Sequence, residues 1–504
     1  MKKASIITIA ILTGIIIISC AISVLTLFSQ SIRLDESQSL WDAAKPIGDL
    51  LRTTSLDVEA PLYLIILHFW IQVFGVNILY PRILSLFFFI SSLPLLYLVY
   101  KESSNRKIAL VSVAFFALSP FLLWYSSEAR TYTLFILVTS VNHLYFLRMM
   151  RSQGKSGKLG YLVSVIVGLY THYFFVFLAF TQCLYALLQL VIKVYKDKQF
   201  KKVSFLKLAW KHRHPFWEYV VMLVIAALCF FPWLVYVIIL GFASNTQPLI
   251  PRPTSYSLFQ SLVTFTFGFQ PQGIQDLLIS LWPLLVVSFF FVFTRRTRMF
   301  VSNMSYFIFI TFMPITIMYL GSYIKPIFLS RYLIFVTPTL FFVIAWLLLS
   351  YSKKVSTFLI CGFFVCTMTL LVYQNSSSDT PVKEDYRDVD RYLSTHAQPS
   401  DIIAVSAPFT IYPVEYGYTG YAGIVTIPEW DRYEEGSIPK FTLANLEKQI
   451  KKYKASYTHI YIVLSYNQGY QQTIVDYMDK YFAREELTKF SPGLEVREYR
   501  LRYE

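Results

Sequence analysis

Eleven stretches of the chain are apolar enough to be read as helices that cross a lipid bilayer. Such a helix needs roughly 20 mostly apolar residues, because its backbone polar groups must be satisfied inside the segment. Soluble proteins carry about a quarter charged residues, whereas this chain of 504 residues carries 15%. We therefore predict a polytopic α-helical membrane protein with about 11 transmembrane helices, over residues 5–28, 81–100, 108–125, 132–148, 159–172, 174–192, 216–238, 277–294, 302–321, 333–350 and 355–373.

Lysine and arginine are unevenly distributed among the predicted loops. With the N-terminus in the cytoplasm, the inner loops hold 22 basic residues and the outer loops before residue 376 hold eight. Cytoplasmic loops of membrane proteins carry such an excess of positive charge. The formal net charge of +15 is then explained by topology and by contact with anionic membrane lipid, and nucleic acid is not a predicted partner.

The first outer loop, residues 29–80, contains one apolar run that we predict not to cross. Residues 61–75 are too short for a full span and include His68 and Gln72. Counting this run as a span would invert every later loop and place the basic residues outside. We therefore expect residues 61–75 to form a helix lying at the outer interface. The stretch around 258–268 is a second candidate for an interfacial helix.

Eleven crossings leave residues 376–504 outside the cell, after a catalytic membrane domain over residues 1–375. The C-terminal part alternates between helical and strand patterns, which predicts a small extracytoplasmic α/β domain. It carries neither a glycine-rich phosphate loop nor a nucleophile triad, so a structural cap or a partner-docking module is the interpretation we favour. Its expected helices are 384–396, 442–455 and 470–482, and its expected strands are 401–407, 422–427, 458–464 and 494–502.

Acidic residues are scarce in the membrane domain and gather in one place. Residues 1–375 contain eleven, of which six lie between residues 29 and 60. Carboxylates close to a membrane are costly, so their concentration on one surface indicates a function. Asp42 and Asp49 are read as solvated loop acids. Asp35 and Asp57, by contrast, each lie beside a membrane-embedded segment, where a carboxylate is partly desolvated.

Six short motifs, in order over about 300 residues, give the sequence a specific resemblance. It resembles the family 39 glycosyltransferases, which include protein mannosyltransferases and the bacterial lipid A aminoarabinose transferases. The motifs are Asp35-Glu36, Asp57-Val58-Glu59-Ala60-Pro61-Leu62-Tyr63, Pro81-Arg82-Ile83-Leu84-Ser85, Leu118-Ser119-Pro120 with Tyr125-Ser126-Ser127-Glu128-Ala129-Arg130-Thr131-Tyr132, Tyr170-Thr171-His172-Tyr173, and Ser330-Arg331-Tyr332-Leu333.

The sequence departs from the family pattern at three of these positions. Glu59 and Ala60 replace a His and the first Pro of the second motif, and Ser127 replaces a Gln. A glutamate in place of histidine keeps an acceptor or metal ligand but adds negative charge. The role of Glu59 is therefore less well defined than that of Asp35.

The resemblance implies the GT-C fold and an enzyme of the bacterial plasma (inner) membrane. Such an enzyme moves a monosaccharide from a polyprenyl-phosphate donor, of the undecaprenyl-phosphate type, to an acceptor on the outer face, with inversion. The acceptor hydroxyl must lose its proton as it attacks, which calls for a carboxylate base, and the departing phosphate calls for cations. The family places Asp35 in the position of the general base.

We assign the remaining candidate site residues on the same grounds. Glu36 and Asp57 join Asp35 as candidate catalytic acids, and Glu59 and His172 are the pair that would hold a divalent metal. The expected substrate-binding residues are Glu59, Arg82, Tyr125, Glu128, Arg130, His172, Arg331 and Tyr332. The sequence leaves the sugar, and the choice among lipid, polysaccharide and protein acceptors, open.

The alternative function is a transporter or lipid flippase with an outer binding domain. Transporters usually place charged residues inside spans near the midplane, often in repeated halves. The predicted spans here are nearly free of acids and show no repeat. A sensor or scaffold would not need the acidic first loop, so the enzyme is the preferred hypothesis.

Overall fold

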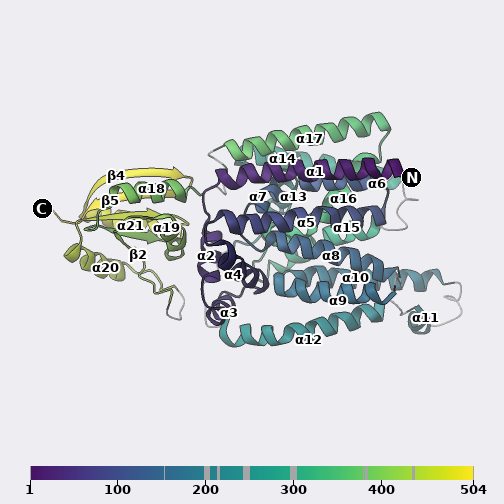
Figure 1. The fold of residues 1–504 in the computed structure, drawn as a ribbon, viewed down its shortest axis with the longest axis horizontal. Coiled ribbons are helices and arrows are strands. Elements are labelled where there is room, and N and C mark those ends of the chain that lie inside the picture. Colours follow the sequence, from purple (N-terminus) through teal and green to yellow (C-terminus); the bar gives the residue numbers. More distant parts are fainter. Residues whose placement is uncertain are drawn as a thin grey trace.

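The computed structural model describes residues 2–151, 154–197, 205–212, 216–241, 250–295, 304–377, 380, 384–433 and 438–502. It consists of a long helical bundle with a smaller sheet-containing domain at one end (Figure 1). Parts of the predicted inner basic loop 193–213 and of the polar linker near residue 378 lie outside the described residues.

Eight helical segments in the described part of the chain are long and apolar enough to cross a membrane, so the protein is a multi-pass membrane protein. Their lipid-facing sides are rich in exposed apolar side chains, as expected where lipid replaces water. They are α1 (Lys2–Ser29), α5 (Leu79–Ser103), α8 (Tyr132–Met150), α10 (Phe175–Lys196), α12 (Phe216–Gly241), α15 (Met304–Gly321), the 3-10 helix η2 (Ser330–Val336) continued by α16 (Thr337–Leu349), and α17 (Lys353–Ser376).

The remaining three predicted spans form helices that are not both long and apolar enough to be counted with these eight. The segment 108–125 is a pair, α6 (Arg106–Ala117) and α7 (Pro120–Ser126), bent by 61°, because Pro120 has no N–H with which to continue the first helix. Counting this pair as one span gives nine in the described residues, against the 11 predicted. Helix α9 (Gly154–Thr171) carries Lys155 and Lys158 within its first five residues, and the apolar part of α14 (Gln272–Arg295) is the shorter segment Gln272–Ser288.

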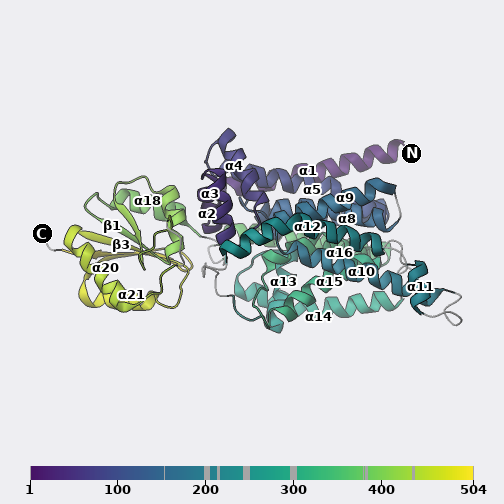
Figure 2. The same cartoon turned by 90° about the horizontal axis from the view of Figure 1, so that it is seen from below.

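The first outer loop folds into three short helices between the bundle and the C-terminal domain (Figures 1 and 2). These are α2 (Leu34–Ala43), α3 (Ile47–Leu56) and α4 (Leu62–Phe74). Helix α4 is the apolar run expected not to cross. Its 13 residues make a helix of about 20 Å, which is shorter than the roughly 30 Å hydrocarbon layer.

Two further helices complete the described membrane domain. Helix α13 (Ser255–Phe267) contains the stretch that was expected to be another interfacial helix, and α11 (Phe205–His212) lies at the end of the bundle away from the C-terminal domain (Figure 1). Glu102 at the end of α5 pairs with Arg148 in the last turn of α8 and with Arg151 just after it. Basic side chains therefore gather at the end that α11 marks.

The C-terminal domain is built on a five-stranded sheet of order β2-β1-β3-β5-β4. The first three strands in this order are parallel, β5 runs antiparallel to β3, and β4 pairs antiparallel with β5. Three expected helices and four expected strands coincide with observed elements. The elements are α18 (Tyr386–His396), β1 (Ile402–Ser406), η3 (Pro408–Thr410), α19 (Ile411–Gly417), β2 (Gly423–Thr426), α20 (Leu443–Ser456), β3 (His459–Leu464), α21 (Gln471–Tyr481), β4 (Ala483–Ser491) and β5 (Leu494–Arg500).

Alternate residues of the central strands face two separate layers. Ile403 and Val405 pack in the same core as α18, whereas Ile402 and Ala404 pack with α20 and α21. Helices therefore cover both faces, which explains why these strands read as continuous apolar runs. Strand β4 was not predicted, because its sequence AREELTKFS is mostly polar and its side chains are mostly exposed at the sheet edge.

The sheet domain is joined to the outer loop by specific hydrogen bonds. Arg387 donates from its backbone N–H to Ser31 Oγ and from its guanidinium to Gln30 O. Tyr416 accepts from the Ile78 N–H at 2.8 Å. These contacts hold the C-terminal domain against the segment between α1 and α2 and against the residue that precedes α5.

Candidate active site

A cavity of about 1910 Å³ lies where the bundle, the first outer loop and the C-terminal domain meet. It is far larger than a pocket for one small ligand, which occupies roughly 300–1,000 Å³. Nine of the eleven candidate site residues line it, all except Glu36 and Arg82. These nine are Asp35, Asp57, Glu59, Tyr125, Glu128, Arg130, His172, Arg331 and Tyr332.

Asp35 lies in the first turn of α2 and faces Arg331, which follows it by 296 positions in the sequence. Its Oδ2 accepts from Arg331 Nη1 at 2.9 Å, and the two side chains are 30% and 33% exposed. Burial raises the pKa of Asp35, but the charges of Arg331, Arg130 and Arg33 outweigh it, so the pKa is lowered from its ordinary value. Asp35 is therefore ionised at neutral pH and reachable from the cavity.

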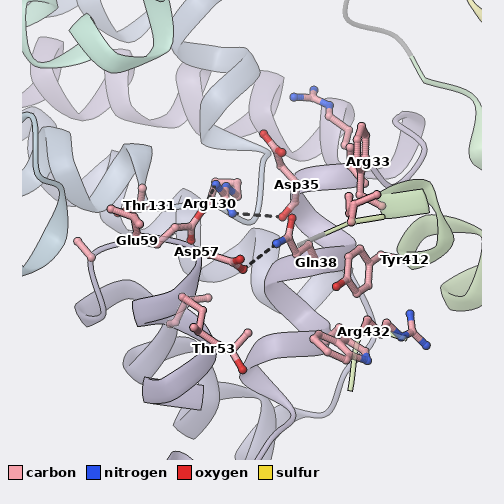
Figure 3. A pocket seen from close by; sticks show the side chains of 18 of the residues that line it. Arg33, Asp35, Gln38, Thr53, Asp57, Glu59, Arg130, Thr131, Tyr412 and Arg432 are labelled. Carbon is pink, nitrogen blue, oxygen red and sulfur yellow. Dashed lines mark hydrogen bonds and ion pairs between the residues drawn. The ribbon is translucent and has the colours of Figure 1, made fainter. Parts of the chain in front are cut away.

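Arg130 links the two acidic segments of the outer loop. It donates to Ser39 Oγ on α2 and to Glu59 Oε1, each at 2.9 Å. Figure 3 shows its guanidinium between the Asp35 side and the Glu59 side of the cavity. Its Nε is a buried donor with no hydrogen-bond partner among the described residues. An unpaired buried donor in a cavity wall is suited to a ligand oxygen.

Asp57 forms the centre of a second group of acids. It accepts from Gln38 Nε2 at 3.1 Å (Figure 3). Burial, followed by the charges of Asp42 and Glu59, raises the pKa of Asp57 to about 8. Asp57 is thus largely protonated at neutral pH, in contrast to Asp35. The next residue, Val58, has a φ of 55°, which is strained for a β-branched residue. It turns the chain between Asp57 and Glu59.

Asp42 is part of this group, contrary to the expectation that it is a solvated loop acid. It is buried and forms an ion pair with Lys45 at 2.9 Å. Burial raises its pKa to about 6. The sequence could not show this, because the burial of Asp42 depends on how α2 packs in the folded protein. Asp49 is exposed, as expected.

Glu128 pairs with Arg33 inside the wall of the cavity. The Arg33 guanidinium also lies over the ring of Trp124, 3.7 Å from its centroid, a cation–π contact. Burial raises the pKa of Glu128 to about 7, although Arg33 opposes this shift. Glu128 therefore has a local partner, and it also borders the cavity.

Glu36 and Arg82 lie behind the cavity and not in it. Their side chains are 0% and 1% exposed and meet at 2.7 Å. Glu36 also accepts from the backbone N–H groups of Arg33 and Ala129. We therefore revise the expected catalytic role of Glu36 and the substrate-binding role of Arg82. The pair fastens α2 to α5 and to the loop before α8, because one buried ion pair with additional hydrogen bonds is shared among all three.

His172 and Tyr332 form an aromatic part of the wall. His172 stacks on Phe135 at 4.7 Å and lies 5.9 Å from the ring of Tyr332. Its Nδ1 accepts from the Phe174 N–H. Glu59 and His172, the expected metal pair, both border the cavity. The group of three metal-ligating side chains in the described residues lies elsewhere, on the sheet, and consists of His459, Glu485 and Glu498. There Arg500 pairs with Glu485 and Tyr461 donates to Glu498.

Sequence reasoning missed the contribution of the C-terminal domain. Glu384 lines the cavity, and its Oε2 accepts from the N–H of Leu34 at the start of α2, one residue before Asp35. Trp41 on α2 lies 5.1 Å from Tyr412 of the C-terminal domain. No motif marks these residues, because the chain has 37 Tyr, 44 Phe and 9 Trp and only the folded arrangement selects a few of them.

Comparison with known proteins identifies the fold. No protein-family model and no curated protein matches the sequence. The structure is similar to that of ArnT from Cupriavidus metallidurans in the apo state, with a TM-score of 0.55, 11% identity, and coverage of 96% of this chain and 98% of that one. The same protein bound to undecaprenyl phosphate gives a TM-score of 0.53 at 10% identity, with 98% of both chains covered. The chain thus has the GT-C fold over nearly its whole length.

Proposed function

We propose that this protein is a membrane glycosyltransferase that transfers a monosaccharide from a polyprenyl-phosphate donor to an acceptor hydroxyl. The observation that carries the proposal is the pairing of Asp35 with Arg331 in the wall of the large cavity. A carboxylate base and a cation for phosphate are the two groups that this reaction requires. The shared fold with an ArnT that binds undecaprenyl phosphate supports the choice of lipid.

The proposed reaction is a single displacement with inversion at the anomeric carbon. The acceptor oxygen forms a bond to that carbon and passes its proton to a carboxylate oxygen of Asp35. The bond between the anomeric carbon and the phosphate oxygen breaks, and its electron pair stays on the departing lipid phosphate. Asp35 combines a lowered pKa with a carboxylate that is 30% exposed beside Arg331 in the cavity wall.

The leaving phosphate gains negative charge and needs donors that are already in place. We assign this role to Arg331 and Arg130, whose guanidinium groups present several N–H donors in a fixed geometry. The Nε–H of Arg130 can donate a hydrogen bond to a phosphate oxygen, since it lacks a partner among the described residues. When Arg331 turns to the phosphate, its hold on Asp35 weakens, and the pKa of the base then rises towards its ordinary value.

Topology is part of the proposal. We infer an N-terminus in the cytoplasm of a bacterium and a C-terminal domain, residues 376–504, outside the plasma (inner) membrane. Two facts support this orientation. The C-terminal domain and the α11 end lie at opposite ends of the bundle (Figure 1), and the basic side chains at the end of α8, Arg148 and Arg151, belong to the α11 end. A cavity at the outer end would meet lipid donors in the outer leaflet.

Transport is the competing function. The charged groups of the cavity come from the outer-loop helices, from helix ends at one end of the bundle and from the C-terminal domain beside that end (Figures 1 and 3). A path for a polar substrate would instead need such groups near the membrane midplane. This placement favours transfer over transport. Glu59 and His172, which both border the cavity, remain the pair that would hold a divalent cation there.

The direct test is incubation of the purified protein with synthetic undecaprenyl-phosphate sugars and a panel of lipid, glycan and peptide acceptors. Mass spectrometry would detect both the glycosylated product and the released lipid phosphate. We expect a mass increase of one sugar unit that depends on Asp35. Movement of an intact lipid-linked sugar between leaflets, without cleavage of its phosphate bond, would support the transporter instead.

A further inference from the structure

The cavity has a second wall, formed by aromatic residues of the C-terminal domain. We define the aromatic wall as Tyr412, Trp430, Tyr433, Phe441 and Tyr470, all of which line the cavity. Phe441 and Tyr470 stack with their ring centroids 4.5 Å apart and an interplanar angle of 4°. Tyr412 lies on α19, Tyr470 directly precedes α21, and the other three rings come from the segment between β2 and α20. Several aromatic rings gathered around a cavity offer flat apolar faces beside polar groups.

Arg432 is set within this wall and has an unused donor. Its side chain is 7% exposed, and its guanidinium carbon lies 5.1–5.2 Å from the rings of Trp41, Tyr412 and Tyr433. One nitrogen, Nη2, pairs with Glu415. The other, Nη1, is buried and has no hydrogen-bond partner among the described residues. Figure 3 shows Arg432 next to Tyr412, across Gln38 from Asp57.

Trp430 repeats this pattern two residues earlier. Its indole packs against Tyr412, with ring centroids 6.4 Å apart, and its Nε1 is likewise buried without a partner in the described part of the chain. Buried donors are normally satisfied by protein or ligand acceptors, because an unpaired donor is costly. Two orphan donors next to one set of aromatic faces therefore indicate a ligand that brings oxygen acceptors and an apolar face.

We propose that the aromatic wall binds a sugar unit of the acceptor, which would make the acceptor a neutral glycan. A sugar ring has an apolar C–H face that packs on aromatic rings and hydroxyl oxygens that accept hydrogen bonds. Glu415 neutralises Arg432, so the wall does not require an anionic ligand. This inference rests on the proposed function for the identity of the reaction but not for the binding itself.

The position of the wall fits an acceptor that reaches the proposed base. Trp41, which contacts both Tyr412 and Tyr433, is six residues after Asp35 on the same helix. At 1.5 Å per residue, this separation is about 9 Å along α2. A short glycan held on the wall can therefore extend a terminal hydroxyl to Asp35. Lys440 also lines the cavity, so an acidic glycan is the alternative that the experiment must separate.

The test measures glycan binding to the full-length protein in lipid nanodiscs without any donor. The probes are neutral tetrasaccharides of glucose, mannose, galactose and N-acetylglucosamine, an acidic tetragalacturonate, and a tetra-alanine peptide, followed by saturation-transfer NMR and calorimetry. We expect at least one neutral tetrasaccharide to bind. Trp430→Phe, which keeps a ring and removes the N–H, and Arg432→Gln should each weaken that binding at least about fivefold.

Two more variants keep the result decisive. Tyr433→Ala changes a side chain that is 76% exposed and should weaken binding without affecting folding. Tyr421→Ala is the matched control, since Tyr421 is 88% exposed on the same domain and does not line the cavity. Undecaprenyl-phosphate binding, measured separately, should be unchanged in all four variants, so a failure of the proposed function would show there and not in the glycan assay.

The proposal is overturned if no neutral tetrasaccharide binds, or if the wall variants bind as tightly as the wild type. Preferential binding of the tetragalacturonate would assign the wall to acidic glycans, and preferential binding of the peptide would assign it to a protein acceptor. Either result also contradicts the proposal.

Discussion

Arg331 and Asp35 are 296 positions apart in the sequence, and their side chains form an ion pair of 2.9 Å. The contact joins the start of the η2–α16 span to the first turn of α2. It means that, in the absence of donor, the proposed base is held by the proposed phosphate-binding cation. A donor phosphate competes for Arg331 and so releases Asp35. Binding of the donor and activation of the base are thereby coupled through one guanidinium.

The first prediction concerns the base. Asp35→Asn keeps the shape of the side chain and removes its basicity, so transfer should fall at least about 100-fold, the usual effect of losing a general base. Undecaprenyl-phosphate binding should persist, because Arg331 loses a competitor. Turnover of a synthetic donor, read by mass spectrometry, gives the rate. If Asp35→Asn is active and Asp57→Asn is inactive, Asp57 is the base.

The second prediction concerns the phosphate. Arg331→Ala removes a charge-assisted hydrogen bond worth about 1.5–3 kcal/mol, which should weaken donor affinity roughly tenfold to a hundredfold. Arg331→Lys should restore only part of it, since lysine lacks the planar fork. Donor titration of the initial rate measures the change. Arg252→Ala, an exposed arginine outside the cavity lining, is the control. Unaltered donor affinity in Arg331→Ala would remove this role.

The third prediction tests whether Glu36 and Arg82 stabilise the fold or bind substrate. Because the pair is fully buried, Arg82→Met leaves an uncompensated carboxylate and should destabilise the protein by about 3–5 kcal/mol. The double variant Glu36→Gln with Arg82→Met should recover part of that loss. Thermal unfolding in detergent measures both. A stable Arg82→Met variant that loses only donor binding would instead restore the substrate-binding role expected from the sequence.

The fourth prediction is a pH dependence of stability at Asp57. The folded protein raises the pKa of this acid from 3.8 to about 8, so the unfolded chain ionises first as pH rises. Stability is therefore lost between about pH 4 and pH 8 and is constant above that range. Asp57→Asn mimics the protonated acid and should remove the loss.

The expected readout is a melting temperature that exceeds that of the wild type by more at pH 8 than at pH 5, by a difference on the order of a few degrees. The matched control is Asp49→Asn, which removes an exposed carboxylate of the same outer loop. An Asp57→Asn effect that does not change with pH would show that Asp57 is ionised in the folded protein.

Much of the architecture is determined locally and was therefore predicted. Apolar runs of about 20 residues specify membrane helices without reference to the rest of the chain. Helix α4 was predicted not to cross from its short length, its polar residues and the distribution of basic loops. The strands β1 and β3 were visible because burial on both faces makes them continuously apolar. Strand β4 was not visible, since an exposed edge strand needs no apolar pattern. The bend at Pro120 turned one predicted span into two helices.

The sequence by itself also determined which chemistry to look for. Acids and arginines are scarce in a chain of this kind, and they occur here within motifs that resemble those of a glycosyltransferase family. Only the tertiary structure decided which of them share a cavity. Glu36 is adjacent to Asp35, yet a helix turns successive side chains by about 100°, so one enters a buried ion pair and the other faces the cavity. Arg432 and Trp430 reach the same cavity from the C-terminal domain. Contacts between residues hundreds of positions apart depend on how helices and domains pack, and no local pattern encodes that packing.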